Sequence, residues 1–120
     1  MIRPITEAMF LCPCGKCDQK VKPVPELLAD IQSIQAKVPF NLDITSGVRC
    51  VAHNKAVGGA PGSRHLSGEA CDILLPDSQS AYQILWWAMS RQNLKFFELC
   101  PKHLHVDVRC GTKRIIVGAG

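Results

Sequence analysis

The segment HLHVDV at residues 103–108 constrains the fold more than any other, because polar and apolar residues alternate along it. Successive side chains of a β-strand point to opposite faces of the sheet, so three polar residues share one face: His103, His105 and Asp107. Buried polar groups cost free energy unless they are paired or coordinate a metal ion. We therefore predict a strand with one face in the core and the other at a functional site.

The other periodic segments predict an α+β domain with a mostly antiparallel sheet and two or three helices. Apolar spacing and capping residues predict helices at 24–39, 51–57 and 76–92. Runs of strand-forming residues predict further strands at 41–45, 69–75, 94–99 and 113–117. A turn at 110–112 favours a hairpin between the last two strands. We expect residues 1–120 to form one domain with a cysteine-rich N-terminal segment at about residues 1–20.

Charge and hydropathy argue against several classes of protein. The net charge is +4, but the basic residues are scattered, which favours solubility over nucleic-acid binding. No apolar run is long enough for a membrane span, and the N-terminus lacks the apolar core of a secretory signal. We therefore expect a monomer that is cytoplasmic as synthesised and has no nucleic-acid or membrane partner.

Seven cysteines are many for a cytoplasmic chain, and their odd number argues against a complete disulfide framework. Three of them, Cys12, Cys14 and Cys17, form the cluster CPCGKC, whose thiolates could hold a structural zinc ion. A second CxxC that would complete four ligands is absent from the sequence. The remaining four are interpreted as isolated, small buried apolar residues: Cys50, Cys71, Cys100 and Cys110. We favour reduced or partly paired thiols, with a second zinc at the N-terminal cluster as the alternative.

A further group of polar residues surrounds the strand predicted at 69–75. Asp72 stands among its apolar residues, and His65 lies just upstream in a glycine-rich loop. If this strand neighbours the one at 103–109, His65, Asp72 and one histidine of HLH converge. Two imidazole nitrogens and one carboxylate oxygen are a donor set of catalytic zinc sites, with the fourth position left to water. The sequence therefore predicts one catalytic Zn²⁺.

The segments SGVR, HN, VGGAPGSRHLSGEACDI and HLHVDV together resemble the M15 zinc peptidases, which include D-alanyl-D-alanine carboxypeptidases and phage endolysins. The resemblance spans about residues 42–109 and follows the pattern S-x-H-x(6)-D with a later H-x-H. It implies the hedgehog/DD-peptidase fold and zinc ligands at His65, Asp72 and His105. It also implies that Arg49 and Ser63 hold the carboxylate and peptide groups of the substrate.

The role of general base falls to Glu98 or His103. Family members with the motif E-x-x-H place a glutamate three residues before the last ligand, but Lys102 stands there in this chain. Strand geometry favours His103, because its side chain shares a face with the last ligand. His53 and Asn54, by contrast, are interpreted as structural residues that tie down the loop carrying the first ligand.

The function that the resemblance implies is hydrolysis of peptidoglycan stem peptides by a metal-activated water, in a carboxypeptidase or an endopeptidase. A phage lysis system would then release the protein to the cell wall. Two alternatives from other classes stay open. One is a zinc-bearing binding module of the same fold that does not catalyse a reaction. The other is an iron oxygenase, since two histidines and a carboxylate also form its facial triad.

Overall fold

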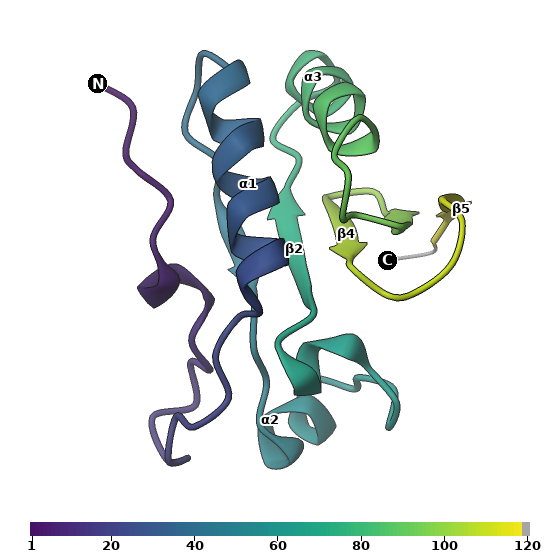
Figure 1. Cartoon of the computed structure of the whole chain (residues 1–120). Coiled ribbons are helices and arrows are strands. Elements are labelled where there is room, and N and C mark those ends of the chain that lie inside the picture. The colour runs from purple at the N-terminus through teal and green to yellow at the C-terminus, as the bar shows by residue number, and fades with distance from the viewer. Residues whose placement is uncertain (119–120) are drawn as a thin grey trace.

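The computed structural model describes residues 1–118 and has the α+β architecture that the sequence predicts (Figure 1). The helices of this region are α1 (Pro25–Lys37), α2 (Val51–Ala56) and α3 (Ser78–Met89). The strands are β1 (Ile44–Ser46), β2 (Ala70–Leu74), β3 (Phe96–Leu99), β4 (His103–Asp107) and β5 (Arg114–Val117). Two short 3₁₀ helices are η1 (Glu7–Phe10) and η2 (Arg64–Ser67). Each predicted helix and strand is present within slightly shorter bounds, except that β1 is displaced from the predicted 41–45 and ends one residue beyond it, at Ser46.

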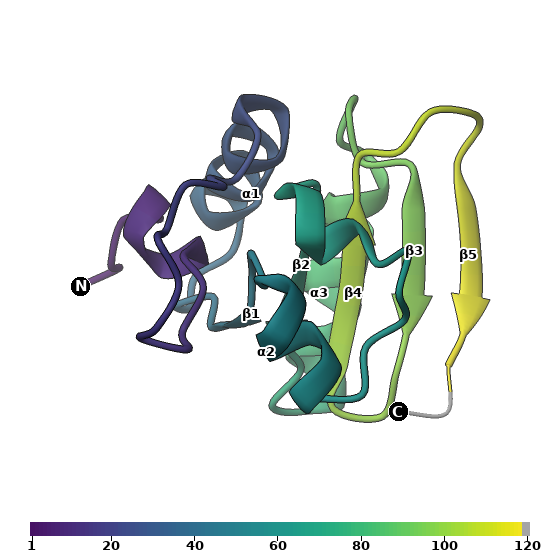
Figure 2. The same cartoon turned by 90° about the horizontal axis from the view of Figure 1, so that it is seen from below.

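The strands of the described residues form one sheet in the order β1-β2-β4-β3-β5, which Figure 2 shows. Its neighbouring strands are antiparallel, except that β3 and β5 are parallel. The predicted hairpin between the last two strands is therefore wrong. Both edges of β4 are already hydrogen-bonded, one to β2 and the other to β3, so β5 passes beyond β3 and pairs with its outer edge.

The core lies between one face of the sheet and the helices α1 and α3, which pack side by side (Figures 1 and 2). Alternate residues of the central strands point into it and are fully buried: Cys71, Ile73, Phe97, Leu104 and Val106. Helix α1 contributes an apolar stripe to the same core: Leu27, Ile31 and Ile34. Each such side chain contributes roughly 1.5–3 kcal/mol on burial, so this packing fixes the sheet that carries the polar residues.

The opposite face of the sheet lies against the segment 47–68, which contains α2 and η2 (Figure 2). The alternation predicted for residues 103–108 places the side chains as expected. Leu104 and Val106 are buried in the core, while His103 and His105 point to the face that η2 covers and are partly exposed. The fold thus presents the polar residues of β2 and β4 to one covered face.

The N-terminal segment packs along the protein and joins the core through Phe10. The Phe10 side chain is fully buried, and its carbonyl oxygen accepts a hydrogen bond from the Val48 N–H at 2.7 Å. Among the cysteines interpreted as buried, Cys71 and Cys100 are indeed buried. Cys110 is exposed, which corrects the interpretation, because it lies in the connection between β4 and β5 at the protein surface.

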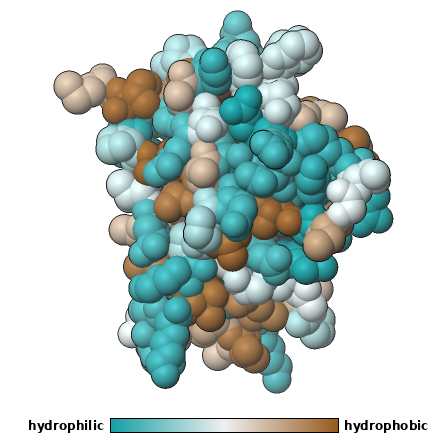
Figure 3. All heavy atoms as spheres, in the orientation of Figure 1, coloured by the Kyte–Doolittle hydropathy of each residue, from teal (hydrophilic) through white to brown (hydrophobic). Residues whose placement is uncertain are grey.

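Hydrophilic side chains dominate the face of the protein seen in Figure 3, with small apolar areas among them. The edge strand β5 adds apolar side chains to the surface of the protein: Ile115, Ile116 and Val117. No helix within residues 1–118 is both long and apolar enough to cross a membrane.

Candidate metal centre

Three elements bring His65, Asp72 and His105 together. His65 lies in η2, Asp72 in β2 and His105 in β4, where Asp72 and His105 are direct cross-strand neighbours. The Ser63 hydroxyl starts η2 by accepting a hydrogen bond from the His65 N–H at 3.2 Å. Gly68 ends it in the left-handed conformation, with φ of 75°, and packs against the Lys22 carbonyl so closely that a side chain would clash. The fixed ends of η2 therefore hold His65 next to Asp72 of β2 and His105 of β4.

The donor atoms of the three residues lie within 4.8 Å of one another. His65 Nε2 is 3.3 Å from Asp72 Oδ1, and His105 Nδ1 is 3.1 Å from the same oxygen. His65 and Asp72 are both buried, and His105 is mostly so. Two imidazoles and a carboxylate thus converge on one point, as the spacing in the sequence predicts.

The tautomer of His65 follows from its second contact. His65 Nδ1 lies 2.6 Å from the Gly47 carbonyl oxygen, and because a carbonyl only accepts, Nδ1 carries the hydrogen. In the neutral ring, Nε2 then presents a lone pair to Asp72 Oδ1, which presents lone pairs of its own. A cation or a proton between the two atoms is needed to make this contact favourable.

His105 is oriented in the same way by Asp107. His105 Nε2 donates to Asp107 Oδ2 at 2.9 Å, and the two oxygens of Asp107 each accept a hydrogen bond of 2.8 Å from Arg109. Burial opposes charge on His105, but the hydrogen bonds with Asp107 and Asp72 outweigh it and raise its pKa to about 9. Burial likewise opposes ionisation of Asp107, yet His105 and Arg109 lower its pKa to about 2.

The role of Asp107 was missed in the sequence, although its place on the polar face of the strand was predicted. Its two-residue spacing from His105 was the available signal, since a carboxylate beside a metal-ligating histidine commonly fixes the ring. The sequence gives no comparable signal for the role of Arg109. Its guanidinium also stacks on the Phe96 ring, 3.8 Å from the centroid, which holds it in place.

The second oxygen of Asp72 faces two further predicted residues. Arg49 Nη2 lies 3.5 Å from Asp72 Oδ2, and His103 Nε2 lies 3.9 Å from it. Burial of Asp72 favours its neutral form, but hydrogen bonds with His105 and His65 dominate and hold its pKa well below the usual range. The carboxylate is therefore ionised at neutral pH.

Arg49 is held on both sides before any ligand binds. Its Nε donates to Ser46 Oγ at 3.0 Å and its Nη1 donates to Asn54 Oδ1 at 3.2 Å. Asn54 in turn donates to the Ala60 carbonyl at 2.9 Å, which ties down the loop leading to His65. This contact agrees with the structural interpretation of Asn54. His53 contributes its backbone N–H, which donates to a cysteine sulfur (Cys50) rather than to that loop.

A cavity of about 480 Å³ opens beside the three converging residues. Its lining includes all the predicted site residues: Arg49, Ser63, His65, Asp72, Glu98, His103 and His105. Glu98 is the cross-strand neighbour of His105, and its carboxylate packs against Gly118. His103 Nε2 contacts Asp72 Oδ2 at 3.9 Å, whereas the carboxylate of Glu98 lies beside Gly118.

Comparison with known families agrees with this arrangement. The comparison with curated proteins finds no match to the chain. The family model for peptidase M15 matches residues 5–107, which covers most of the chain and all the residues of the candidate centre. The α+β fold with its mostly antiparallel sheet is consistent with that family. The chain therefore belongs to the peptidase M15 family.

Proposed function

We propose that this protein is a zinc-dependent peptidase that cleaves the stem peptides of peptidoglycan. The observation that carries the proposal is the convergence of His65 Nε2 and His105 Nδ1 on one oxygen of Asp72, at 3.3 and 3.1 Å. Each ring is oriented through its other nitrogen, by the Gly47 carbonyl or by Asp107, as metal-ligating histidines usually are. Membership of the peptidase M15 family supports peptide hydrolysis as the reaction.

The donor set fits a zinc ion. Two imidazole nitrogens and one carboxylate oxygen are ligands that catalytic zinc sites use, and a cation removes the repulsion between lone pairs that face each other here. When bound, zinc supplies a Lewis acid that lowers the pKa of water and polarises a peptide carbonyl. The family match and these ligands favour a peptidase over an iron oxygenase.

We assign His103 as the general base. Its Nε2 lies 3.9 Å from Asp72 Oδ2, and 27% of its side chain is exposed, so it borders the cavity beside the ligands. It accepts a proton from water as the water oxygen bonds to the peptide carbonyl carbon. It then delivers the proton to the nitrogen that leaves when the C–N bond breaks. Glu98 is the second candidate for this role.

The arginines of the cavity lining, which stand beside the carboxylates of Asp72 and Glu98, suit a peptide with an anionic end. Three arginines line the cavity: Arg49, Arg64 and Arg109. We assign Arg49 to the substrate carboxylate, because a guanidinium pairs with a carboxylate through two parallel hydrogen bonds. Arg49 is already fixed by hydrogen bonds to two side chains, so little side-chain entropy is lost when a substrate binds. Ser63 lies in the same lining, where we assign its hydroxyl to a peptide group of the substrate.

The proposal is tested by digestion of purified peptidoglycan and of a D-Ala-D-Ala peptide with the zinc-loaded protein. Mass spectrometry of the products identifies the bond: free D-alanine indicates a carboxypeptidase, and larger fragments indicate an endopeptidase. His65→Ala is the inactive control. Metal bound at the candidate centre with no product from either substrate would overturn the peptidase and favour a zinc-bearing binding module.

A further inference from the structure

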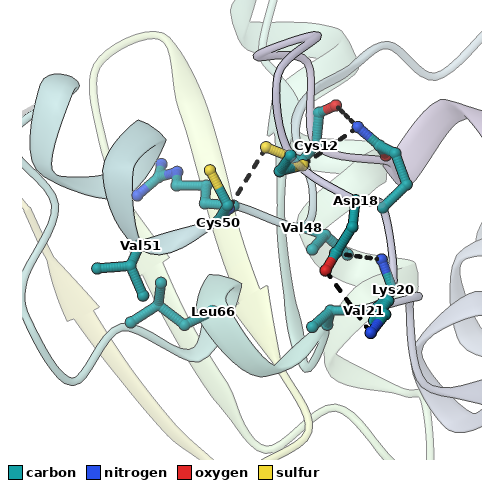
Figure 4. Close-up of a pocket in the computed structure, with 11 residues that line it drawn as sticks. Cys12, Asp18, Lys20, Val21, Val48, Cys50, Val51 and Leu66 are labelled. Atoms are coloured by element: carbon teal, nitrogen blue, oxygen red, sulfur yellow. Dashed lines mark hydrogen bonds and ion pairs between the residues drawn. The ribbon is translucent and has the colours of Figure 1, made fainter.

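Four cysteines from two distant parts of the chain meet at the start of α2, outside the lining of the cavity that holds the histidines. Cys12, Cys14 and Cys17 come from the N-terminal segment, and Cys50 caps the start of α2. Their sulfur atoms all lie within 4.8 Å of one another, and Figure 4 shows Cys12 and Cys50 side by side. The interpretation of Cys50 as an isolated apolar residue is therefore wrong. It supplies the fourth thiol that the sequence motif lacks.

The spacing of the sulfurs matches a tetrahedral metal site. Zinc–sulfur bonds of about 2.3 Å in a tetrahedron place the sulfurs about 3.8 Å apart. Cys14 Sγ and Cys50 Sγ lie 3.8 Å apart. A disulfide needs about 2.05 Å between sulfurs, and Cys12, Cys14, Cys17 and Cys50 are all unbridged.

Each of the four sulfurs also accepts a hydrogen bond from an N–H group. The backbone N–H of Cys50 donates to Cys12 Sγ at 3.3 Å, and the backbone N–H of Lys16 donates to Cys14 Sγ at 3.3 Å. The backbone N–H of His53 donates to Cys50 Sγ at 3.4 Å. The Gln19 side chain donates to Cys17 at 3.3 Å. Such donors stabilise negative charge on sulfur. Four thiolates this close repel one another unless a cation lies between them.

We propose that Cys12, Cys14, Cys17 and Cys50 bind a structural zinc ion. Four thiolate ligands complete a tetrahedral site and leave no position for water, so this ion stabilises the fold and does not catalyse hydrolysis. The site joins the N-terminal segment to the connection between β1 and α2, which also carries Arg49. It stands independently of the proposed peptidase function.

Metal content and cobalt spectroscopy of the full chain, purified under reducing conditions, test this site. We expect the wild type to bind one zinc more than Cys50→Ser. Cobalt-loaded wild type should show a thiolate-to-cobalt charge-transfer band that Cys50→Ser loses. Cys110→Ser is the matched control, because it removes an exposed cysteine outside the quartet, and it should keep both the zinc and the band.

Thiol alkylation of the wild type tests the same site without a substitution. Mass-spectrometric mapping should find the four cysteines protected when zinc is bound and reactive after a chelator removes it. A wild type whose zinc content equals that of Cys50→Ser, or that lacks the charge-transfer band, would overturn the site. Disulfides within the quartet of the freshly purified protein would also overturn it.

Discussion

His65 Nδ1 donates a hydrogen bond to the carbonyl oxygen of Gly47, eighteen residues earlier in the chain, over 2.6 Å. Gly47 at the same time packs against the backbone of Phe10, whose oxygen would lie 2.6 Å from a Cβ at position 47. Only glycine permits this close approach. Gly47 therefore both orients a candidate zinc ligand and allows the N-terminal segment to pack closely at Phe10.

Gly47→Ala should destabilise the protein by about 1–3 kcal/mol, because the added methyl group meets backbone atoms that cannot rotate away. It should also weaken zinc binding at His65, since the Gly47 carbonyl shifts. Urea unfolding and zinc titration measure the two effects. Gly62→Ala is the matched control, because nothing lies within 4 Å of a Cβ there. Equal stability of the two variants would contradict the prediction.

Asp72→Ala should remove zinc from the candidate centre together with peptidase activity, because one carboxylate oxygen contacts both histidines. Metal analysis and a hydrolysis assay on the same preparation measure the two losses. Asp43→Ala, which removes a carboxylate that is half exposed and paired with Arg3, should leave both unchanged. Zinc content at the wild-type level in Asp72→Ala would exclude Asp72 as a ligand.

Arg49→Ala should impair cleavage of a peptide with a free C-terminal carboxylate by about 2–4 kcal/mol in kcat/KM, the loss for one partner of a desolvated charged pair. An amidated peptide, which lacks that charge, should be cleaved with a much smaller loss. Arg64→Ala is the control, because this arginine also lines the cavity but is more exposed. Equal losses on both peptides would instead assign Arg49 to the positioning of Asp72.

His103→Ala should lower kcat by roughly 10²–10⁴-fold while zinc stays bound, since general-base catalysis is lost and the ligands remain. Glu98→Gln should retain most of the activity, because the Glu98 carboxylate packs against Gly118. Steady-state kinetics with metal analysis distinguishes the two. Full activity and normal metal content in His103→Ala would transfer the role to Glu98.

Asp77 should make the stability of α3 depend on pH. Its side chain accepts a hydrogen bond from the Ser80 N–H at 2.7 Å, and this bond lowers the pKa of Asp77 below 3.8. The contribution is therefore present above about pH 4 and is lost as the pH falls through the lowered value. Asp77→Asn keeps a capping side chain without the titration. Urea midpoints measured into the acid range should fall more steeply in the wild type than in this variant.

Residue patterns within short segments of the sequence predicted much of the fold and of the candidate centre. The two-residue period of β4 and the spacing of His65 and Asp72 are signals within short segments, and the structure brings these residues together with His105 as predicted. The position of β5 was not predictable in this way, because it depends on which strand edges are already occupied. The contact between Cys50 and Cys14 joins residues 36 positions apart, and no pattern in a single sequence marks such a pair.

The central place of β4 in the sheet has a consequence for how the chain folds during synthesis. β2 and β3 are both made before β4, yet each pairs with it. The two pairings of β4 cannot form until residue 107 has left the ribosome, and such non-local pairing slows folding. The candidate metal centre lacks His105 until the end of β4 has been synthesised. All four residues of the cysteine quartet have been synthesised by residue 50. The proposed site of the cysteine quartet can therefore form before the candidate metal centre is complete.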